Sequence, residues 1–346
     1  MLDKRPKIIS INSVITENYL SVRGLVGVEP VKNINLKHIT PVSRVRLLKK
    51  KKFNIHFKIN DNHSSLETDQ YGFFSYRERV SFNDSLSSNI EFTLHAKQDS
   101  DATLYFLGSY QPSILTKQKK IVISDFDKTL VETKYKTFKE VYQSLTLPII
   151  NFPTLKFQTE FLKEKINEGH LPFILSSSPN FYGPSIKEWL KLNNIPSDNI
   201  FLKDYRQFLS LFPSDLFLKD ISSHGVHKLS QLINIYLMTN IPSEIVLMGD
   251  NSESDPLIYS IFAKIAADDF SPDDLWNEIK SKKEFLFTNT QSLKFLNKLY
   301  QAKNLNRNKK AKTKISIYIR PVPDKKNKSL PKFLEEYQNK IEYFKE

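Results

Sequence analysis

The sequence predicts an α/β domain built on a parallel sheet, preceded by a β-rich, sandwich-like N-terminal domain. Before about residue 115, apolar and polar residues alternate at period two, as they do in strands that bury one face. After residue 120, short apolar runs alternate with helix-like stretches, which indicates a parallel sheet with helices on both faces. A chain of 346 residues has room for about two such domains.

The N-terminal domain is expected over residues 1–115. Its clearest alternating segments are 8–11, 53–59 and 90–95. Turn-like stretches separate them at 61–63 and 69–72. Short strands at this spacing favour an antiparallel sandwich. A linker follows at 111–120.

The second domain is expected over residues 120–320. Its strands are predicted at 121–124, 173–176, 245–248 and 315–319, with helices at 157–168 and 228–237. The segment from about residue 273 to 305 is predicted as mainly helical and is long for a simple crossover, so it either covers the site or enlarges the contact with the N-terminal domain. Residues 321–346 are predicted as a basic linker that ends, from residue 329, in an amphipathic helix.

Composition restricts the possible chemistry and partners. The absence of cysteine excludes disulfides, thiolate zinc sites and cysteine nucleophiles. No run of about 18 apolar residues occurs, so no bilayer-spanning segment is expected and a cytoplasmic location is the default. The net charge of +13, concentrated partly in Lys49–Lys52 and 303–328, suits nucleic acid or an anionic membrane surface. A solvated lysine-rich surface is the alternative.

The first buried run of the second domain ends in two carboxylates. Asp125 and Asp127 are two residues apart, so both side chains of an extended segment point the same way. One could attack phosphorus to form an aspartyl phosphate, and the other could protonate the leaving oxygen and then activate water. Two close carboxylates need a cation, and magnesium suits such a site. Taken alone, the pair is also compatible with a turn or a helix cap.

The other two strand ends supply further polar groups. Ser176 can bind a phosphate oxygen, although serine in a Ser-Ser-Ser-Pro run is also ordinary turn chemistry. Asp250 and Asp255 can complete the coordination of a hard cation or form a solvated acidic loop. Lys228 can offset phosphoryl charge, with a surface lysine as the alternative. The order of these residues along the chain favours the catalytic interpretation.

This combination of motifs resembles the haloacid dehalogenase superfamily. The resemblance is carried by Asp125-Phe126-Asp127-Lys128-Thr129, Ser176, Lys228, Gly249-Asp250 and Asp255. More narrowly, the chain resembles the actin-patch-associated phosphatidate phosphatase family, which is related to the lipin phosphatases. This narrower likeness lies in residues 176–179, 249–259 and 317–320.

The resemblance implies a Rossmann-like domain, magnesium dependence and an aspartyl-phosphate intermediate. By position, Asp125 would be the nucleophile and Asp127 the general acid and base, while Ser176 and Lys228 would hold the phosphate. The implied magnesium ligands are Asp125, Asp250, Asp127 through its backbone carbonyl, and Asp255 either directly or through another ligand. Two features depart from the family pattern: Lys128 replaces an acidic residue, and the insertion at 270–312 delays the last strand.

The substrate is expected to be bulky. The intervals from Thr129 to Ser176 and from Ser176 to Lys228 are too short for a large cap domain. The resemblance implies hydrolysis of phosphatidate, an anionic lipid, to diacylglycerol and phosphate at a membrane surface, with peripheral membrane association. Nucleic-acid ends and phosphoproteins are alternative substrates, and a non-catalytic lipid-binding module is the alternative of another class.

Overall fold

The fold is that of a computed structural model. It describes residues 4–30, 51–59, 62–80, 91–97, 103–115, 118–133, 149, 152–203, 224–252, 254–285, 287, 289–307, 311–323, 325 and 329–344. Parts of the predicted lysine-rich runs, including Lys49, Lys50 and residues 326–328, lie outside these ranges, as does the first residue of the strand predicted at 90–95.

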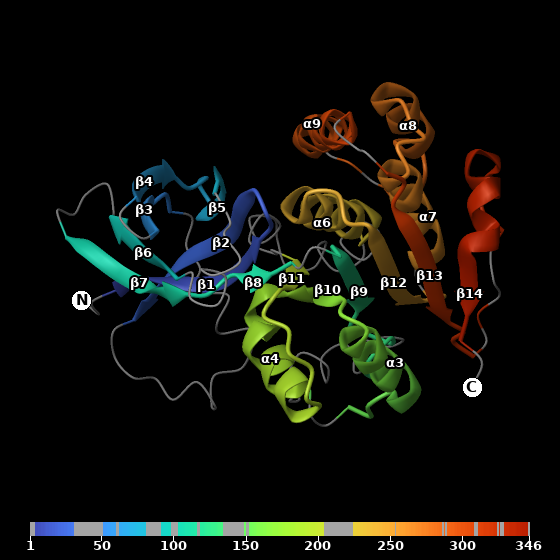
Figure 1. Ribbon diagram of the computed structural model, residues 1–346, viewed down its shortest axis with the longest axis horizontal. Coiled ribbons are helices and arrows are strands. Elements are labelled where there is room, and N and C mark those ends of the chain that lie inside the picture. The colour runs from blue at the N-terminus through green and yellow to red at the C-terminus, as the bar shows by residue number, and fades with distance from the viewer. Residues whose placement is uncertain are drawn as a thin grey trace, which may run out of the picture.

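Two four-stranded sheets form the N-terminal region (Figure 1), as the alternating pattern predicted. The first sheet has the order β5-β2-β1-β8 and the second the order β4-β3-β6-β7. Neighbouring strands are antiparallel, except that β8 runs parallel to β1. The bounds are β1 (Lys4–Ile15), β2 (Tyr19–Pro30), β3 (Asn54–Ile59), β4 (Asn62–Glu67), β5 (Phe73–Arg79), β6 (Phe92–Lys97), β7 (Leu104–Tyr110) and β8 (Ser113–Ile114).

The two sheets share one apolar core. Val22 and Phe74 from the first sheet pack with Phe57 and Phe92 from the second, and the Phe57 and Phe74 rings are 5.7 Å apart. Burying every second residue of each strand produces the period-two pattern seen in the sequence. β8 is a difference from the prediction, because it lies inside the expected linker and pairs with the end of β1.

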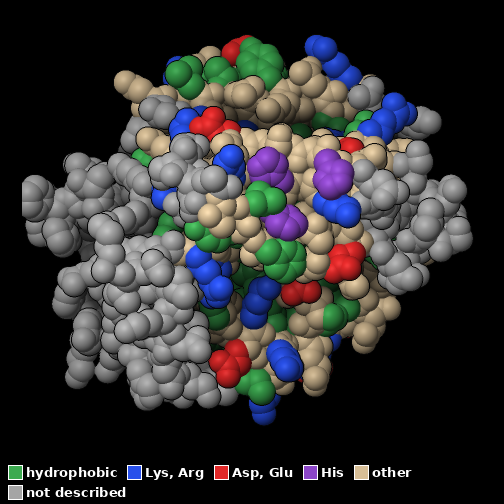
Figure 2. Space-filling view, turned by 90° about the vertical axis from the view of Figure 1, so that its left-hand side faces the viewer, with side chains coloured by type: hydrophobic (Ala, Val, Ile, Leu, Met, Phe, Trp, Pro, Cys, Tyr) green, Lys and Arg blue, Asp and Glu red, His purple; other side chains and the backbone are tan. Residues whose placement is uncertain are grey.

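The outer face of the second sheet is turned to solvent. His56 and His95 are direct cross-strand partners on β3 and β6, and His63 lies on the adjacent β4. On β7, the side chain of Phe106 is 63% exposed. Figure 2 shows histidine, lysine and hydrophobic side chains gathered on this side of the molecule. The outer face of the first sheet points the other way, toward the second domain.

A six-stranded parallel sheet forms the centre of the second domain, with the order β11-β10-β9-β12-β13-β14. The chain fills one side of β9 first and then continues on the other side from β12. In sheets with this reversal of order, ligands bind outside the carboxyl ends of the strands at the reversal. The bounds are β9 (Lys120–Asp125), β10 (Leu171–Pro179), β11 (Ile200–Lys203), β12 (Glu244–Asp250), β13 (Lys314–Arg320) and β14 (Ile341–Tyr343).

Helices cover both faces of this sheet (Figure 1), as predicted. Val122 of β9 packs on one face with Leu162 and Trp189, whereas its neighbours pack on the other face against α6 and α7. Strands buried on both faces are apolar throughout, which explains the uninterrupted runs in the sequence. The helices are α3 (Lys156–Asn167), α4 (Gly183–Leu192), α6 (His224–Thr239), α7 (Asp255–Ala266), α8 (Pro272–Ile279) and α9 (Asn289–Asn306).

The insertion is helical, as expected, because α8 and α9 occupy most of 270–312. α9 packs against α6 and α7. In the part of the chain that the structure describes, no helix is both long enough and apolar enough to cross a membrane.

The C-terminal residues correct one prediction. Residues 329–346 were expected as an amphipathic helix, but the structure has a 3-10 helix at Lys332–Lys340 followed by β14, which pairs in parallel with β13. Leu334 and Tyr337 are three residues apart and both are buried. A three-residue apolar spacing suits a 3-10 turn as well as an α-helix, and β13 offers an edge with which the chain can pair.

Candidate active site

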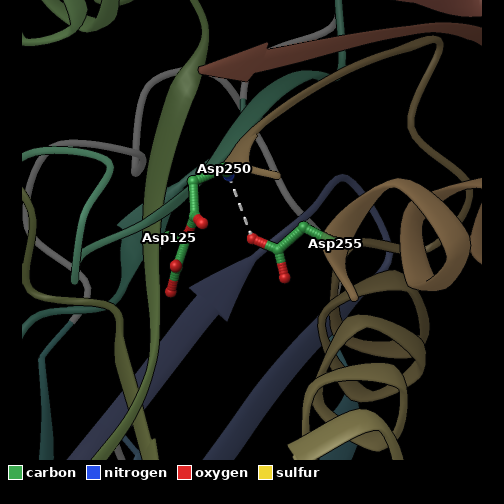
Figure 3. Close-up of side chains that lie close together, drawn as sticks. All are labelled: Asp125, Asp250 and Asp255. Atoms are coloured by element: carbon green, nitrogen blue, oxygen red, sulfur yellow. Dashed lines mark hydrogen bonds between the residues drawn. The ribbon is translucent and has the colours of Figure 1, made fainter. Parts of the chain in front are cut away.

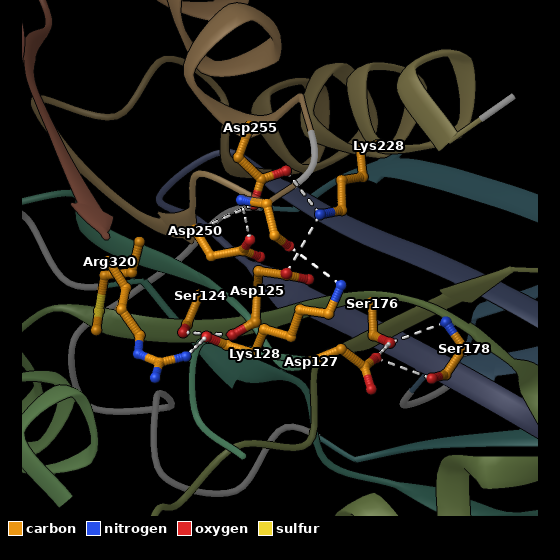
Figure 4. A network of polar contacts seen from close by, with 12 residues as sticks. Ser124, Asp125, Asp127, Lys128, Ser176, Ser178, Lys228, Asp250, Asp255 and Arg320 are labelled. Atoms are coloured by element: carbon orange, nitrogen blue, oxygen red, sulfur yellow. Dashed lines mark hydrogen bonds and ion pairs between the residues drawn. The ribbon is translucent and has the colours of Figure 1, made fainter. Parts of the chain in front are cut away.

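The carboxyl ends of three parallel strands bring the predicted site residues together (Figure 4). Asp125 ends β9, Ser176 lies near the end of β10, and Asp250 ends β12. Lys228 comes from α6 and Asp255 from the first turn of α7. β9 and β12 are adjacent strands at the reversal of strand order, so their last residues meet where a ligand can enter.

Three of these carboxylates form a compact buried group (Figure 3). Asp125, Asp250 and Asp255 each offer one oxygen, and these oxygens lie within 4.8 Å of one another. Their side chains are at most 2% exposed. Carboxylates at this separation repel one another, and burial makes that repulsion costly unless a cation offsets it. An all-oxygen donor set suits a hard cation such as magnesium.

Lys228 reaches this group from α6 (Figure 4). Its side chain is 1% exposed, so the surface-lysine alternative is wrong. Its Nζ lies 2.6 Å from Oδ1 of Asp255 and 3.2 Å from Oδ2 of Asp125. One ammonium against three carboxylates still leaves an excess of negative charge, so Lys228 does not replace a metal ion there.

Asp255 ties two parts of the site together. While its Oδ1 accepts from Lys228, its Oδ2 accepts a hydrogen bond from the backbone N–H of Asp250 at 3.3 Å. The Asp250 carboxylate in turn accepts from the N–H of Ser252 at 2.6 Å, which holds the turn after β12. Both oxygens of Asp255 are thus used within the protein, which fits a positioning role better than direct coordination.

Asp127 has different surroundings. Its Oδ2 accepts hydrogen bonds from the hydroxyls of Ser176 at 2.8 Å and Ser178 at 2.9 Å. The N–H of Ser178 donates to the Ser176 hydroxyl at 2.9 Å, which orders this pair. The side chain of Asp127 therefore lies outside the three-carboxylate group, and coordination through its backbone carbonyl stays a prediction.

Ser178 was not among the predicted site residues. It lies two residues after Ser176, and side chains two apart in an extended strand point to the same side. That spacing was visible in the Ser-Ser-Ser-Pro run and could have marked both serines as partners of one carboxylate.

Arg320 holds the loop that follows the first strand. Its Nη1 donates to the backbone carbonyl of Lys128 at 2.9 Å, and its Nη2 lies 2.8 Å from a carboxylate oxygen of Glu132. Lys128 has a positive φ of 58°, an uncommon conformation for a residue with a side chain, and its Nζ donates to Ser252 at 3.1 Å. Arg320 lies in the segment 317–320 that carries part of the family resemblance, but its contact with this loop was not predicted.

Gly249 allows the close approach of α7 to the end of β12. A Cβ atom at this position would lie 2.5 Å from Oδ2 of Asp255 and 2.7 Å from the ring of Tyr259. The Tyr259 hydroxyl donates to the carbonyl of Met248 at 2.9 Å. Burial, followed by the charges of Asp255 and Asp125, raises the pKa of Tyr259 well above its usual value, so its phenol stays neutral.

The chain has only weak matches among solved structures, and their low TM-scores indicate neither its fold nor its function. The chain is similar to a β-glucuronidase from an uncultured Clostridium species, with 8% identity over 91% of this chain and 61% of that one and a TM-score of 0.20. It is also similar to a carbohydrate acetylesterase from Xanthomonas citri, with 7% identity over 88% of this chain and 66% of that one and a TM-score of 0.26. The chain thus spans about two thirds or less of the length of each of these two proteins. No curated protein matches the sequence.

Comparison with protein families gives a specific result for the second domain. Residues 120–270 match the family described as phosphatidate phosphatase APP1, catalytic domain. The matched region contains all six predicted site residues, from Asp125 on β9 to Asp255 on α7. The narrower resemblance noted in the sequence is thereby confirmed: residues 120–270 of this chain are similar to the catalytic domain of the APP1 phosphatidate phosphatases.

Proposed function

We propose that the chain is a magnesium-dependent phosphatase of the haloacid dehalogenase type that hydrolyses phosphatidate to diacylglycerol and inorganic phosphate. The observation that carries this proposal is the contact of Lys228 with Asp125, beside a buried group of three carboxylates, inside the region that matches the family. A nucleophile, a charge-stabilising lysine and an oxygen donor set are the components that phosphoryl transfer requires.

In the first step, a carboxylate oxygen of Asp125 attacks the phosphorus atom. A new oxygen–phosphorus bond forms on Asp125, and the ester bond to the glycerol oxygen breaks. Asp127 gives its proton to that oxygen, so diacylglycerol leaves as an alcohol. The hydroxyls of Ser176 and Ser178 hold the Asp127 carboxyl in one orientation for this transfer.

In the second step, water hydrolyses the aspartyl phosphate. Asp127 takes a proton from the attacking water, the bond between Asp125 and phosphorus breaks, and phosphate is released. Asp125 is then a free carboxylate and Asp127 again carries a proton, so the residues return to their starting states. The same side chain acts as acid and then as base, which requires only one protonatable group beside Asp125.

The remaining residues balance charge. Asp125 and Asp250 would hold magnesium, with the backbone carbonyl of Asp127 as a further expected ligand. When bound, the metal ion neutralises the excess carboxylate charge and the charge on the phosphoryl oxygens. Lys228 stabilises the charge that develops on the transferred group, and Asp255 fixes the position of Lys228.

The lipid substrate is supported by the family match and by net charge. A chain with a net charge of +13 is attracted to anionic membrane surfaces, where phosphatidate is found. We therefore propose peripheral membrane association. Nucleic-acid ends and phosphoproteins are also anionic and are tested alongside the lipid. A non-catalytic lipid-binding module is disfavoured because Asp125 and Asp127 are both present in the expected places.

The proposal is tested by phosphate release from a panel of substrates. Purified protein should release phosphate from detergent micelles containing phosphatidate in magnesium but not in EDTA, and less from lysophosphatidate, a phosphopeptide or a 5′-phosphorylated oligonucleotide. Asp125→Asn should abolish release because an amide is a poor nucleophile toward phosphorus. Asp198→Asn is the matched control. The Asp198 side chain is 90% exposed, and it forms a surface ion pair with Lys187 at 3.5 Å.

Two results would contradict the proposal in different ways. Activity on the oligonucleotide or the phosphopeptide alone would overturn the lipid assignment and leave the chemistry standing. Full activity of Asp125→Asn would overturn the mechanism.

A further inference from the structure

A cavity lies away from the candidate active site, between the first N-terminal sheet and the second domain. Its volume is about 1110 Å³. The outer face of β2 and β5 forms one wall, and α6, the turn after α6, and α9 form the opposite wall. None of the carboxylates of the candidate active site lines it. In Figure 1, β2 and β5 lie on the side of α6 that faces away from β12.

The strand pattern places polar side chains in this cavity. Leu20 and Val22 of β2 point into the sandwich core and are fully buried, so Ser21 and Arg23 point out of the opposite face. On β5, Ser75 pairs with Arg23 and Arg77 pairs with Ser21. The face of the sheet that meets the second domain is therefore cationic and hydroxylated rather than apolar.

Two cations face each other across the cavity. Arg23 donates to the Ser75 hydroxyl at 3.4 Å, and Lys298 of α9 donates to the backbone carbonyl of Ser230 at 3.5 Å. Among the residues that the structure describes, neither cation forms an ion pair with a carboxylate. Both side chains keep part of their surface accessible, which is the part that borders the cavity.

The rest of the lining adds more positive charge than negative charge. Arg77, Lys119 and Lys312 also border the cavity, and Glu17 is the single carboxylate among the described lining residues. Glu17 lies 3.8 Å from Lys119, so it is partly used there. The cavity thus holds an uncompensated cluster of cations.

The enclosure of these cations is energetically unfavourable without a counter-ion. Burial lowers the pKa of Arg23 to about 10. Burial, and then the nearby charge of Arg23, lowers the pKa of Lys298 well below its usual value. Both directions show that the protein surroundings disfavour the charged forms.

We propose that this cavity binds a phosphate-bearing organic anion, whose phosphate group contacts Arg23 and Lys298. The guanidinium of an arginine matches two phosphate oxygens, and a lysine adds a point charge. The volume exceeds what inorganic phosphate needs and lies at the upper end of the range for small-molecule sites.

The remaining lining combines polar and apolar side chains. Asn234, Asn240, Gln301 and Asn304 offer amide donors and acceptors, and Leu237, Met238, Ile241 and Leu305 add apolar surface. A nucleoside, which has hydroxyl groups and an apolar base face, suits such a mixed lining. Because α6 carries both Lys228 and part of this wall, the ligand would bridge the N-terminal sheet to the helix that supplies the lysine of the other site.

The test compares thermal stability in phosphate compounds and in chloride at equal ionic strength, with EDTA present. Inorganic phosphate, AMP, glucose 6-phosphate and dihexanoyl phosphatidate are the probes. In the wild type, AMP or glucose 6-phosphate should raise Tm above the chloride control, because a ligand that binds only the folded state stabilises it. Inorganic phosphate should act more weakly, and the short-chain lipid should not exceed it.

Lys298→Met is the diagnostic variant. It should leave the basal Tm unchanged or higher, since a poorly paired charge is removed, and it should weaken binding of the effective probe by about 10- to 100-fold. Lys294→Met is the matched control, because Lys294 lies on the same helix but does not line the cavity, and it should bind as the wild type does. Asp250→Asn, which removes one buried carboxylate of the active site, should also keep the response, which separates this cavity from the active site.

Several outcomes would overturn the proposal. One is an equal Tm rise in chloride, and another is a probe affinity that Lys298→Met leaves unchanged. If Lys298→Met is unstable, Arg23→Gln takes its place and should show the same loss of affinity for the probe. Unchanged affinity in Arg23→Gln would then overturn the proposal. A larger response to the lipid than to the soluble probes would overturn the ligand class. None of these outcomes affects the phosphatase proposal, which concerns other residues.

Discussion

At the scale of single residues, the two carboxylates that follow β9 have different neighbours. Asp125 faces the ammonium of Lys228 at 3.2 Å and lies beside the carboxylates of Asp250 and Asp255. Asp127 instead accepts from two neutral hydroxyls, those of Ser176 and Ser178. The two residues thus have different surroundings although they are only two positions apart, and the proposed mechanism gives them different tasks.

Asp127→Asn tests the proton-transfer role. Asparagine keeps the shape of the side chain and can still accept from both serines, but it cannot give or take the proton. We expect kcat for phosphate release to fall by about 10²- to 10⁴-fold, with KM changed little. Steady-state kinetics on phosphatidate micelles measure both constants. Ser178→Ala is the comparison, and its fall should be smaller because one of the two hydroxyls remains. A kcat for Asp127→Asn near that of the wild type would exclude the proposed role.

At the scale of elements, the packing of α7 against the end of β12 determines where Asp255 lies. Gly249 has no side chain, and this lets the first turn of α7 approach the strand closely. Asp255 can then contact Lys228 from one oxygen and the backbone of Asp250 from the other. The junction between strand and helix therefore positions the charges of the site.

Gly249→Ala tests this junction. The added methyl group would overlap Oδ2 of Asp255 and the buried ring of Tyr259, so we expect a loss of about 1–3 kcal/mol in the free energy of unfolding and a loss of activity. Urea denaturation followed by circular dichroism measures the first effect, and phosphate release measures the second. Gly183→Ala is the control, because a Cβ there would meet only Leu202 at an ordinary 3.6 Å. Equal stability of the two variants would show that the junction tolerates a side chain.

At the scale of the whole molecule, charge is distributed unevenly. The chain has a net charge of +13, yet its candidate active site holds three buried carboxylates with one lysine, and the cavity beside β2 holds cations with one carboxylate. Each cluster raises the free energy of the folded state unless a ligand of opposite charge binds. The stability of this protein should therefore depend strongly on its ligands.

Magnesium should raise the stability of the protein through the carboxylate group. A metal ion that binds only the folded state at about 100 times its Kd adds about 2.7 kcal/mol. We expect Tm to rise with magnesium chloride and to fall in EDTA, as measured by differential scanning fluorimetry. In Asp250→Asn the response should be lost, while the basal Tm is unchanged or higher because one buried negative charge has been removed. A magnesium response that survives in Asp250→Asn would place the metal elsewhere.

The main layout of the protein can be predicted from its amino-acid pattern. The period-two alternation predicts the two N-terminal sheets, and the apolar runs predict the parallel sheet, because both patterns reflect which faces of a strand are buried. The carboxyl ends of parallel strands meet at one edge, so the sequence also predicts that Asp125, Ser176 and Asp250 lie close together.

The partners of these residues depend on the folded structure. Arg320 holds a carbonyl 192 positions away, and the cavity beside β2 forms where two domains meet. The C-terminal residues became a strand because β13 offered an edge. Such contacts depend on how separate elements pack. A local pattern of apolar and polar residues does not predict that packing. The nucleophilic role proposed for Asp125 follows from the order of residues along the chain. The burial of Lys228 and the opposed cations Arg23 and Lys298 follow from the packing of the folded chain.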